Sequence, residues 1–280
     1  QLYLADMGVK GAGSSHKIGV GEPLGQFYGY ISDGLYQVSD FNYDKASGKY
    51  TLKDGIPYRG EKDKVQPGML KFKNIDGSED NKITEDDKTV IGNAFPKFYG
   101  GINNTFTYKD FDLSIFLTYS FGNDVLNATK LTNTRTALTN KNVLAAADWN
   151  HRWVTINKET GALITDPEEL AAANQGKTIA CFDDNGSSDN AVIHSWAVED
   201  GSYLKLSNIT LGYTFPKKIV NKIGLSKLRL YATGNNLLTW TKYTGYDPEV
   251  SVRNSALTPG LDYSSYPRAY SISFGGSLGF

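Results

Sequence analysis

The stretch Phe111-Asp-Leu-Ser-Ile-Phe-Leu-Thr-Tyr-Ser-Phe121 alternates apolar and polar residues with a period of two. Its odd-numbered positions carry only apolar or aromatic side chains, and among its even-numbered positions only Phe116 is apolar. Such alternation predicts a β-strand with one apolar face. Burying six such side chains is worth on the order of 10 kcal/mol, so a slip of one residue in register would be strongly penalised. The sequence therefore predicts a strand with a well-defined register over 111–121.

The same alternation predicts further strands over 97–108, 203–215, 228–240 and 270–280. Within 203–215, Leu204 and Leu206 are out of phase with Ile209. A β-bulge near Ser207 and Asn208 would bring both halves onto one face. The second face of 228–240 carries Arg229 and Asn235, which suit a wet lumen better than a dry core. We expect about six antiparallel strands in the chain.

The connections between these strands alternate between short and long. Lys109 and Asp110 form a tight turn, 122–201 is a long polar excursion, 216–226 is moderate and 241–267 is long. Outer-membrane β-barrels have this asymmetry, with short periplasmic turns and long extracellular loops. The fold class that we expect is all-β. Residues 1–96 would hold a strand end and a long extracellular loop, and residues 97–280 barrel strands with long loops at 122–201 and 241–267.

Composition narrows the function. A net charge of −1 gives no field that would attract nucleic acid. No run of about 18 apolar residues exists, so a transmembrane helix is not expected. The three histidines lie far apart, and no hydrolase or nucleotide-binding motif is complete, which argues against an enzyme. The alternative to a membrane barrel is a soluble β-sandwich, acting as a glycan-binding or adhesin module with a calcium loop.

An acidic segment has the oxygen spacing of an EF-hand loop. Positions 1, 3, 5, 7, 9 and 12 of such a loop would fall on Asp76, Ser78, Asp80, the carbonyl of Lys82, Thr84 and Asp87. Ile83 would be the apolar anchor, and Asn81 takes the place of the turn glycine because asparagine accepts a left-handed backbone. The segment therefore predicts a Ca²⁺ site, with a solvated acidic turn as the alternative.

Several segments in succession carry a resemblance to a known family. They are Gly21–Tyr30, Gly34–Gln37, Pro67–Lys73, Ile91–Gly101, Glu199–Pro216 and Asn235–Glu249. In this order they resemble the carboxyl-terminal third of a SusC/RagA-type TonB-dependent outer-membrane transporter. The resemblance implies the carboxyl-terminal part of a large antiparallel transmembrane β-barrel of about 22 strands with a plugged lumen. The plug, through which TonB acts, has no counterpart here.

The resemblance also implies a function and partners. A transporter of this kind imports a bulky nutrient across the bacterial outer membrane without altering it, usually an oligosaccharide and sometimes a peptide. Its extracellular loops work with a SusD-like surface lipoprotein that acts as a lid. Aromatic and arginine side chains are the usual anchors of such contacts. The residues that we expect to contact the partner or ligand are Trp149, Arg152, Trp153 and Tyr246.

Overall fold

The computed structural model describes residues 2–6, 14–134, 142–180, 192–251 and 257–280. The chain divides into two compact units, each built from three separate segments. Unit 1 comprises residues 1–93, 126–198 and 252–264, and unit 2 comprises residues 94–125, 199–251 and 265–280. Within the described residues, no helix is both long and apolar enough to cross a membrane. Each unit is described by itself below.

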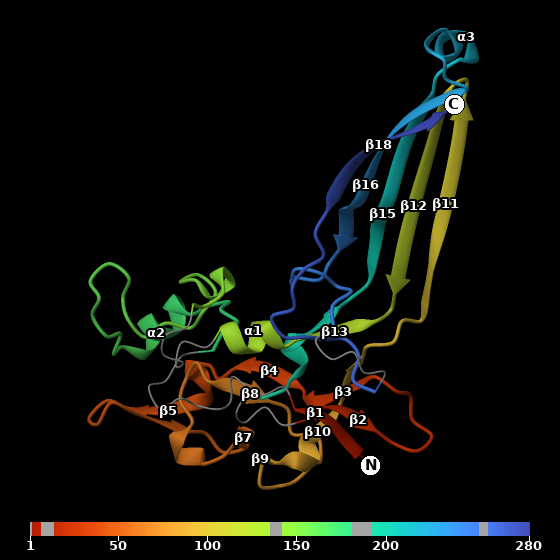
Figure 1. The fold of residues 1–280 in the computed structure, drawn as a ribbon. Coiled ribbons are helices and arrows are strands. Elements are labelled where there is room, and N and C mark those ends of the chain that lie inside the picture. The colour runs from red at the N-terminus through yellow and green to blue at the C-terminus, as the bar shows by residue number, and fades with distance from the viewer. Residues whose placement is uncertain (1, 7–13, 135–141, 181–191, 252–256) are drawn as a thin grey trace. The chain divides into compact units, whose positions relative to one another are not determined.

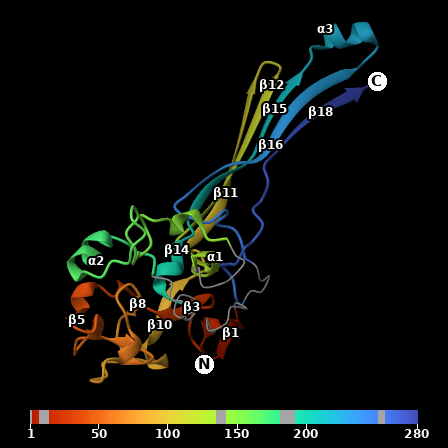
Figure 2. The same cartoon turned by 90° about the vertical axis from the view of Figure 1, so that its left-hand side faces the viewer.

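Unit 2 contains a five-stranded antiparallel sheet, whose strands lie side by side in Figures 1 and 2. Its strands, in spatial order, are β11 (Phe98–Tyr108), β12 (Phe111–Phe121), β15 (Tyr203–Thr214), β16 (Lys227–Thr241) and β18 (Ser271–Gly279). All five predicted strand positions are confirmed. The expected total of about six is wrong for this sheet, because the strands that precede Ala94 pair among themselves in unit 1.

The register of the sheet keeps apolar side chains on one face. β11 and β12 pair without interruption, from Phe98 opposite Phe121 to Tyr108 opposite Phe111. The β15–β16 pairing shifts between Leu206 and Asn208, which confirms the predicted bulge at Ser207. The extra residue lets Leu206 and Ile209 point to the same side although they are three positions apart.

The connection between β15 and β16 consists of α3 (Lys217–Val220) and the 3₁₀ turn η7 (Asn221–Ile223). It ends at Gly224, whose left-handed φ of 78° allows the chain to reverse into β16. At the outer strands, β11 and β18 each pair on one side only among the described residues. The sheet is therefore open in this structure.

Unit 1 consists of small sheets and short helices. One sheet has the order β1 (Leu2–Asp6), β2 (Ser14–Ile18), β3 (Gln26–Tyr30) and β10 (Lys88–Asn93). The two-stranded sheets are β4 (Ser32–Leu35) with β8 (Leu70–Phe72), β5 (Phe41–Asp44) with β6 (Lys49–Leu52), and β7 (Tyr58–Arg59) with β9 (Lys82–Ile83). The α-helices are α1 (Ala128–Asn133) and α2 (Pro167–Ala173). The short strand β17 (Leu261–Asp262) also belongs to unit 1, whereas β13 (Asp124–Asn127) and β14 (Val198–Asp200) each have residues in both units.

Unit 1 also contains 3₁₀ turns, η1 (Val38–Asp40), η2 (Lys62–Lys64), η3 (Glu85–Asp87), η4 (Ala145–Ala147) and η6 (Ser195–Ala197).

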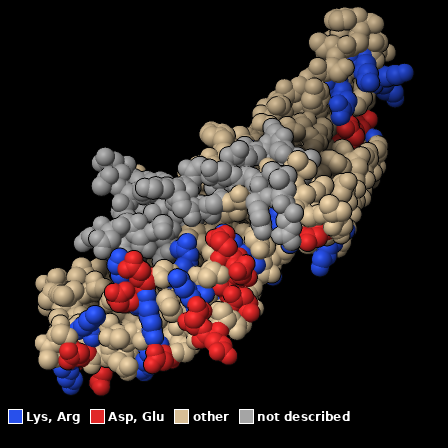
Figure 3. All heavy atoms as spheres, turned by 90° about the horizontal axis from the view of Figure 1, so that it is seen from below, with Lys and Arg blue, Asp and Glu red and all other residues tan. Residues whose placement is uncertain are grey.

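On the face seen in Figure 3, acidic and basic side chains are interspersed over the described part of the chain. No single sign of charge dominates that view, in keeping with the net charge of −1.

The core of unit 1 joins two distant parts of the sequence. Its buried residues from the first segment are Tyr30, Leu35, Leu70, Phe72 and Ile83, and those from the second are Trp153, Ile164, Leu170, Ala180 and Val192. The rings of Tyr30 and Phe72 lie 5.2 Å apart, a favourable aromatic contact. Parts of the excursion 122–201, from Trp153 to Ala180 and at Val192, thus contribute to a shared core.

Candidate functional site

One face of the five-stranded sheet is apolar and exposed. Phe274 is 83% exposed and Ile272 is 60% exposed on β18. Exposed apolar side chains continue across the other strands at Ile102, Phe106, Leu211, Leu230 and Leu238. Contiguous exposed apolar surface of this kind marks contact with another apolar phase or partner. Among the described residues no second sheet covers this face, so the sandwich core that a soluble module would need is not formed here.

Aromatic side chains lie at both ends of this apolar face. At one end the rings of Phe111 and Tyr213 are 4.6 Å apart, with Tyr108 opposite Phe111 in the register. At the other end the rings of Phe98 and Phe121 are 5.3 Å apart. Phe111 and Phe121 are the first and last residues of β12, so they lie about 33 Å apart along the strand. With a strand tilt of about 40°, the apolar band would be about 25 Å tall.

The opposite face of the sheet is polar. Asn208 donates to Asn235 across the strands at 2.8 Å, and the hydroxyls of Thr210 and Thr233 are 2.9 Å apart. Further along, Arg229 donates to both carboxylate oxygens of Asp112, at 3.1 Å from Nε and 2.5 Å from Nη2. The first two contacts join the neighbouring strands β15 and β16, whereas the Arg229–Asp112 contact reaches across β15 from β16 to β12. The face is chemically suited to water.

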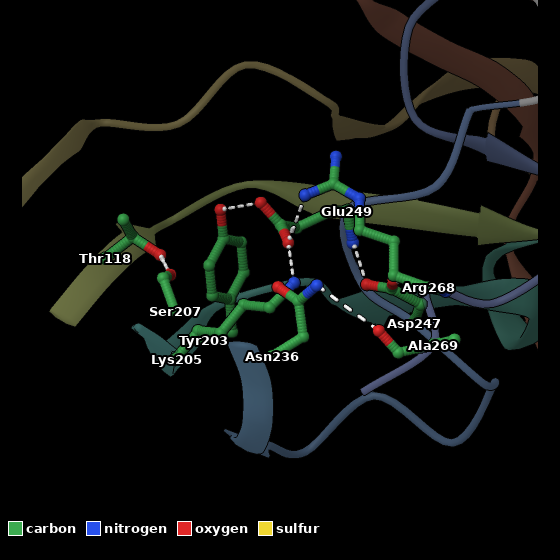
Figure 4. A network of polar contacts seen from close by, with 9 residues as sticks. All are labelled: Thr118, Tyr203, Lys205, Ser207, Asn236, Asp247, Glu249, Arg268 and Ala269. Atoms are coloured by element: carbon green, nitrogen blue, oxygen red, sulfur yellow. Dashed lines mark hydrogen bonds and ion pairs between the residues drawn. The ribbon is translucent and has the colours of Figure 1, made fainter. Parts of the chain in front are cut away.

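A cluster of charged side chains lies where this polar face meets the loop that follows β16 (Figure 4). Lys205 of β15 donates to Glu249 Oε2 at 2.5 Å, and Tyr203 donates its hydroxyl proton to Oε1 at 2.8 Å. Arg268 Nη1 reaches the same Oε2 at 2.9 Å. We call Tyr203, Lys205, Glu249 and Arg268 the Glu249 cluster. Three donors from two segments thus converge on a single carboxylate.

The electrostatics of the cluster favour a charged Glu249. The Lys205 side chain is 3% exposed, and that of Glu249 is also largely buried. Burial raises the pKa of Glu249, but the hydrogen bonds from Lys205 and Tyr203 and the nearby positive charges outweigh it and leave the pKa below its usual value. The carboxylate is therefore ionised at neutral pH and compensates the buried ammonium of Lys205.

Further hydrogen bonds beside the cluster hold residues 247–249 and 268–269. Asp247 accepts hydrogen bonds from the backbone N–H groups of Glu249, at 3.0 Å, and of Arg268, at 3.4 Å. Asn236 donates to the carbonyl of Ala269 at 3.3 Å. Sequence reasoning missed this arrangement, since Lys205 and Glu249 are 44 positions apart. The only sequence signal was a lysine on the polar side of a predicted strand.

The predicted calcium segment is a compact turn. Asn81 has the left-handed backbone expected for it, with φ of 55°, and Ile83 is buried as the expected anchor. Asp87 is fully buried and accepts backbone hydrogen bonds from Ile75, Asp76 and Thr84, at 2.8, 3.3 and 2.8 Å. Its two oxygens thus close the turn through the backbone of the chain.

The other predicted ligands also hold the backbone of this turn. Asp76 accepts from the N–H of Ser78 at 2.8 Å, and Asp80 accepts from the N–H of Lys82 at 3.0 Å. The hydrogen bond from Lys82 lowers the pKa of Asp80. In the described residues, no three His, Cys, Asp or Glu side chains converge as a ready metal site. Calcium binding remains a prediction.

The four expected contact residues lie in different surroundings. Trp149 is half-buried, with the Arg152 guanidinium 5.6 Å and the Lys177 ammonium 6.0 Å from its ring centre. Tyr246 is 81% exposed in unit 2. Trp153 is only 2% exposed and belongs to the core of unit 1, where no partner could reach it. We therefore leave Trp153 out of the proposed contact surface.

Unit 1 contains a cavity of about 480 Å³. Its polar lining includes Asp33, Asp40, Lys71, Lys177 and Ser195, with Trp196 as an aromatic wall. Lys71 lies 3.4 Å from Asp40 and 3.8 Å from Asp33, so part of this charge is already paired. A cavity of this size can hold a small ligand or one or two residues of a polymer.

Comparisons with known proteins define the class. No family model matches the chain. Over most of its length, however, the chain is homologous to a portion of the SusC/RagA-type TonB-dependent receptors. These are transporters, not enzymes, which confirms the sequence prediction on that point.

Among the relatives, TonB-dependent receptor P3 of Formosa agariphila is 34% identical over 93% of this chain. TonB-dependent receptor P39 of the same organism is 28% identical over 93%, and TonB-dependent receptor SusC of Bacteroides thetaiotaomicron is 27% identical over 74%. The chain spans 22%, 25% and 17% of their respective lengths.

Solved structures agree on the fold. A structure of the RagAB peptide importer in its closed-closed state matches 90% of this chain and 23% of its own, with a TM-score of 0.56 and 18% identity. A structure described as the RagAB peptide transporter also matches 90% of this chain and 22% of its own, with a TM-score of 0.54 and 20% identity. The mostly β fold of this chain thus corresponds to part of such a receptor.

Proposed function

We propose that the five-stranded sheet is part of the transmembrane β-barrel of an outer-membrane importer. The observation that carries this proposal is the exposed apolar face of β11 to β18, with aromatic side chains at both ends. Its height of about 25 Å fits the apolar band of outer-membrane barrels. The polar face, with its hydrogen bonds between strands and the Glu249 cluster, would then line the lumen.

The cargo of this importer is proposed to be a bulky nutrient, an oligosaccharide in the first place. The cavity of unit 1 supports this choice, since it combines an indole wall with acceptors and donors of the kind that sugar hydroxyls use. A peptide is the second candidate, because the matching solved structures are described as peptide importers. Energy from TonB would enter through a plug domain of the importer.

A SusD-like lipoprotein is the proposed partner. The side chains that could anchor it are Tyr246, which is exposed, and the Trp149 and Arg152 pair, which is partly exposed. Stable complexes bury well over about 1,000 Å² and rely on a few aromatic and arginine anchors. Substitution of Tyr246 by alanine should weaken co-purification of the lipoprotein in mild detergent, while Tyr43→Ala, another tyrosine change, should not.

We propose the calcium site with a different role for Asp87. Asp76, Ser78, Asp80, Thr84 and the carbonyl of Lys82 would supply oxygens, whereas Asp87 would hold the turn closed. The spacing of the side chains and the left-handed Asn81 support this proposal. Isothermal titration with Ca²⁺ tests it: a paired Asp76→Asn and Asp80→Asn change should abolish the heat of binding.

The transport proposal is tested by uptake. Cells that produce the full-length receptor are offered fluorescent oligosaccharides and fluorescent peptides in parallel, and accumulation is compared with cells that lack it. Uptake of sugars but not peptides supports the first candidate. Equal accumulation of both probes with and without the receptor would contradict the importer itself.

A further inference from the structure

The connection between β15 and β16 is basic and has no acidic residue. Over residues 216–227 it carries Lys217, Lys218, Lys222 and Lys227, and neither Asp nor Glu. All four lysines are exposed. Within the part of the chain that the structure describes, none of the four forms an ion pair. We call residues 216–227 the basic connector.

The basic connector also exposes two apolar side chains. Ile219 is 54% exposed and Ile223 is 66% exposed. They are four positions apart in α3 and η7, so they lie on the same side of this helical turn. Val220 is fully buried, and α3 packs against β16. The buried Val220 thus fixes which side of the connector faces outward.

The connector lies at one end of the apolar face. Figures 1 and 2 show α3 beyond the ends of β15 and β16. Tyr213, near the end of β15, belongs to the aromatic row with Phe111. Phe215, which follows β15 and precedes the connector, has its ring 4.9 Å from that of Tyr213. Aromatic rows of this kind lie at the level of the lipid headgroups. The connector would therefore lie just beyond the apolar band, at the membrane surface.

Among the described residues, no acidic side chain forms an ion pair with a lysine of the connector. Asp112 is engaged by Arg229 through two hydrogen bonds, and Asp110 lies in the turn between β11 and β12. A positive surface beside exposed isoleucines is complementary to a membrane surface that contains anionic lipids. Anionic lipid headgroups attract clustered lysines, while short apolar side chains insert between the acyl chains.

We propose that the basic connector binds anionic phospholipid in the membrane leaflet next to it. This inference rests on the proposed membrane location of the sheet. The ammonium groups of Lys217, Lys218 and Lys222 contact lipid phosphates, and Ile219 and Ile223 enter the edge of the acyl layer. Each lysine near an anionic surface contributes about a fivefold preference at low ionic strength. Three together should give a preference that approaches 100-fold and falls with added salt.

Hydrogen exchange in lipid nanodiscs tests this proposal. The full-length protein is placed in discs of phosphatidylcholine, with and without about a third of phosphatidylglycerol. Peptides that cover 216–226 are followed by mass spectrometry, and the phosphatidylglycerol retained per protein is measured after mild detergent washing. We expect slower exchange of the connector and preferential retention of phosphatidylglycerol.

The matched variants have the same change in charge. The combined change Lys217→Gln, Lys218→Gln and Lys222→Gln should remove the retention and restore fast exchange. The control Lys45→Gln, Lys49→Gln and Lys158→Gln removes three exposed lysines elsewhere and should behave as the unchanged protein. Equal exchange of 216–226 in both discs, or loss of retention in the control as well, would overturn the proposal. If the amides of the five-stranded sheet exchanged at the same rate in discs and in solution, the proposed membrane location of the sheet would be overturned instead.

Discussion

Substitution of Ile115 by arginine should impair insertion of the sheet into a membrane. Ile115 lies on the apolar face of β12, opposite Asn104 of β11 and Ile209 of β15. It is four residues from Phe111, which corresponds to about 13 Å along the strand and about 10 Å across the membrane at a tilt of about 40°. In an apolar band of about 25 Å, this position is close to the midplane.

An arginine near the midplane of a barrel costs about 2–4 kcal/mol. The equilibrium constant for folding should therefore fall by a factor of about 30 to about 700. The next residue provides the matched control. Ser114 lies on the polar face, where its hydroxyl makes only a long hydrogen bond of 3.3 Å to Asn103. Ser114→Arg should cost less than about 1 kcal/mol, and Ile115→Leu should be nearly neutral.

The assay is a urea titration of the full-length protein during folding into phospholipid vesicles. The folded fraction is read from the faster electrophoretic mobility of unheated barrel. If Ile115→Arg and Ser114→Arg shifted the midpoint equally, the assignment of the two faces would be refuted. A larger shift for Ser114→Arg would mean that the outward face is the polar one.

Three further outcomes are expected. Glu249→Gln should cost about 3–5 kcal/mol in urea unfolding because it leaves the buried Lys205 uncompensated, whereas a Lys205→Met and Glu249→Leu double change should cost less than the sum of the two single changes. The pKa of Glu249 in the folded protein lies below its ordinary value of 4.5, so the stabilisation by Glu249 is complete above about pH 4.5 and is lost as the pH falls through the folded pKa. The measurement is the protection factor of 245–251 against hydrogen exchange, which should fall in acid in the unchanged protein but not in Glu249→Gln. Gly68→Ala should destabilise unit 1 by about 1–3 kcal/mol in thermal unfolding, since φ is 88° and the new methyl carbon would lie 2.5 Å from the ring of Trp153; an unchanged melting temperature would contradict that packing.

The five strands of unit 2 could be predicted from the sequence because each carries its own alternation. The bulge at Ser207 was predictable for the same reason, since the phase of Leu204 and Leu206 conflicts with that of Ile209. Local patterns of this kind need no knowledge of distant residues. They were sufficient to identify the apolar face, whereas the class of protein was indicated by the resemblance of several segments in succession to the SusC/RagA family.

The features that the sequence did not reveal depend on which groups meet in the folded chain. Trp153 was expected at a surface because it lies in a polar stretch, but Gly68 leaves room for its indole in the core of unit 1. The Glu249 cluster joins residues whose separation in the sequence exceeds any strand or helix period. Asp87 had the spacing of a metal ligand, and the spacing could not show that its oxygens accept backbone hydrogen bonds.

The divided core of unit 1 has a consequence for how the chain folds. β11 and β12 are joined by only two residues, so their hairpin can form within microseconds. The core that packs Tyr30 with Val192 must instead close a loop of well over 100 residues, which is entropically costly and slow. The first segment of unit 1 therefore stays without its apolar partners until the second has been synthesised. During that interval its apolar side chains are exposed, which makes the segment prone to aggregation.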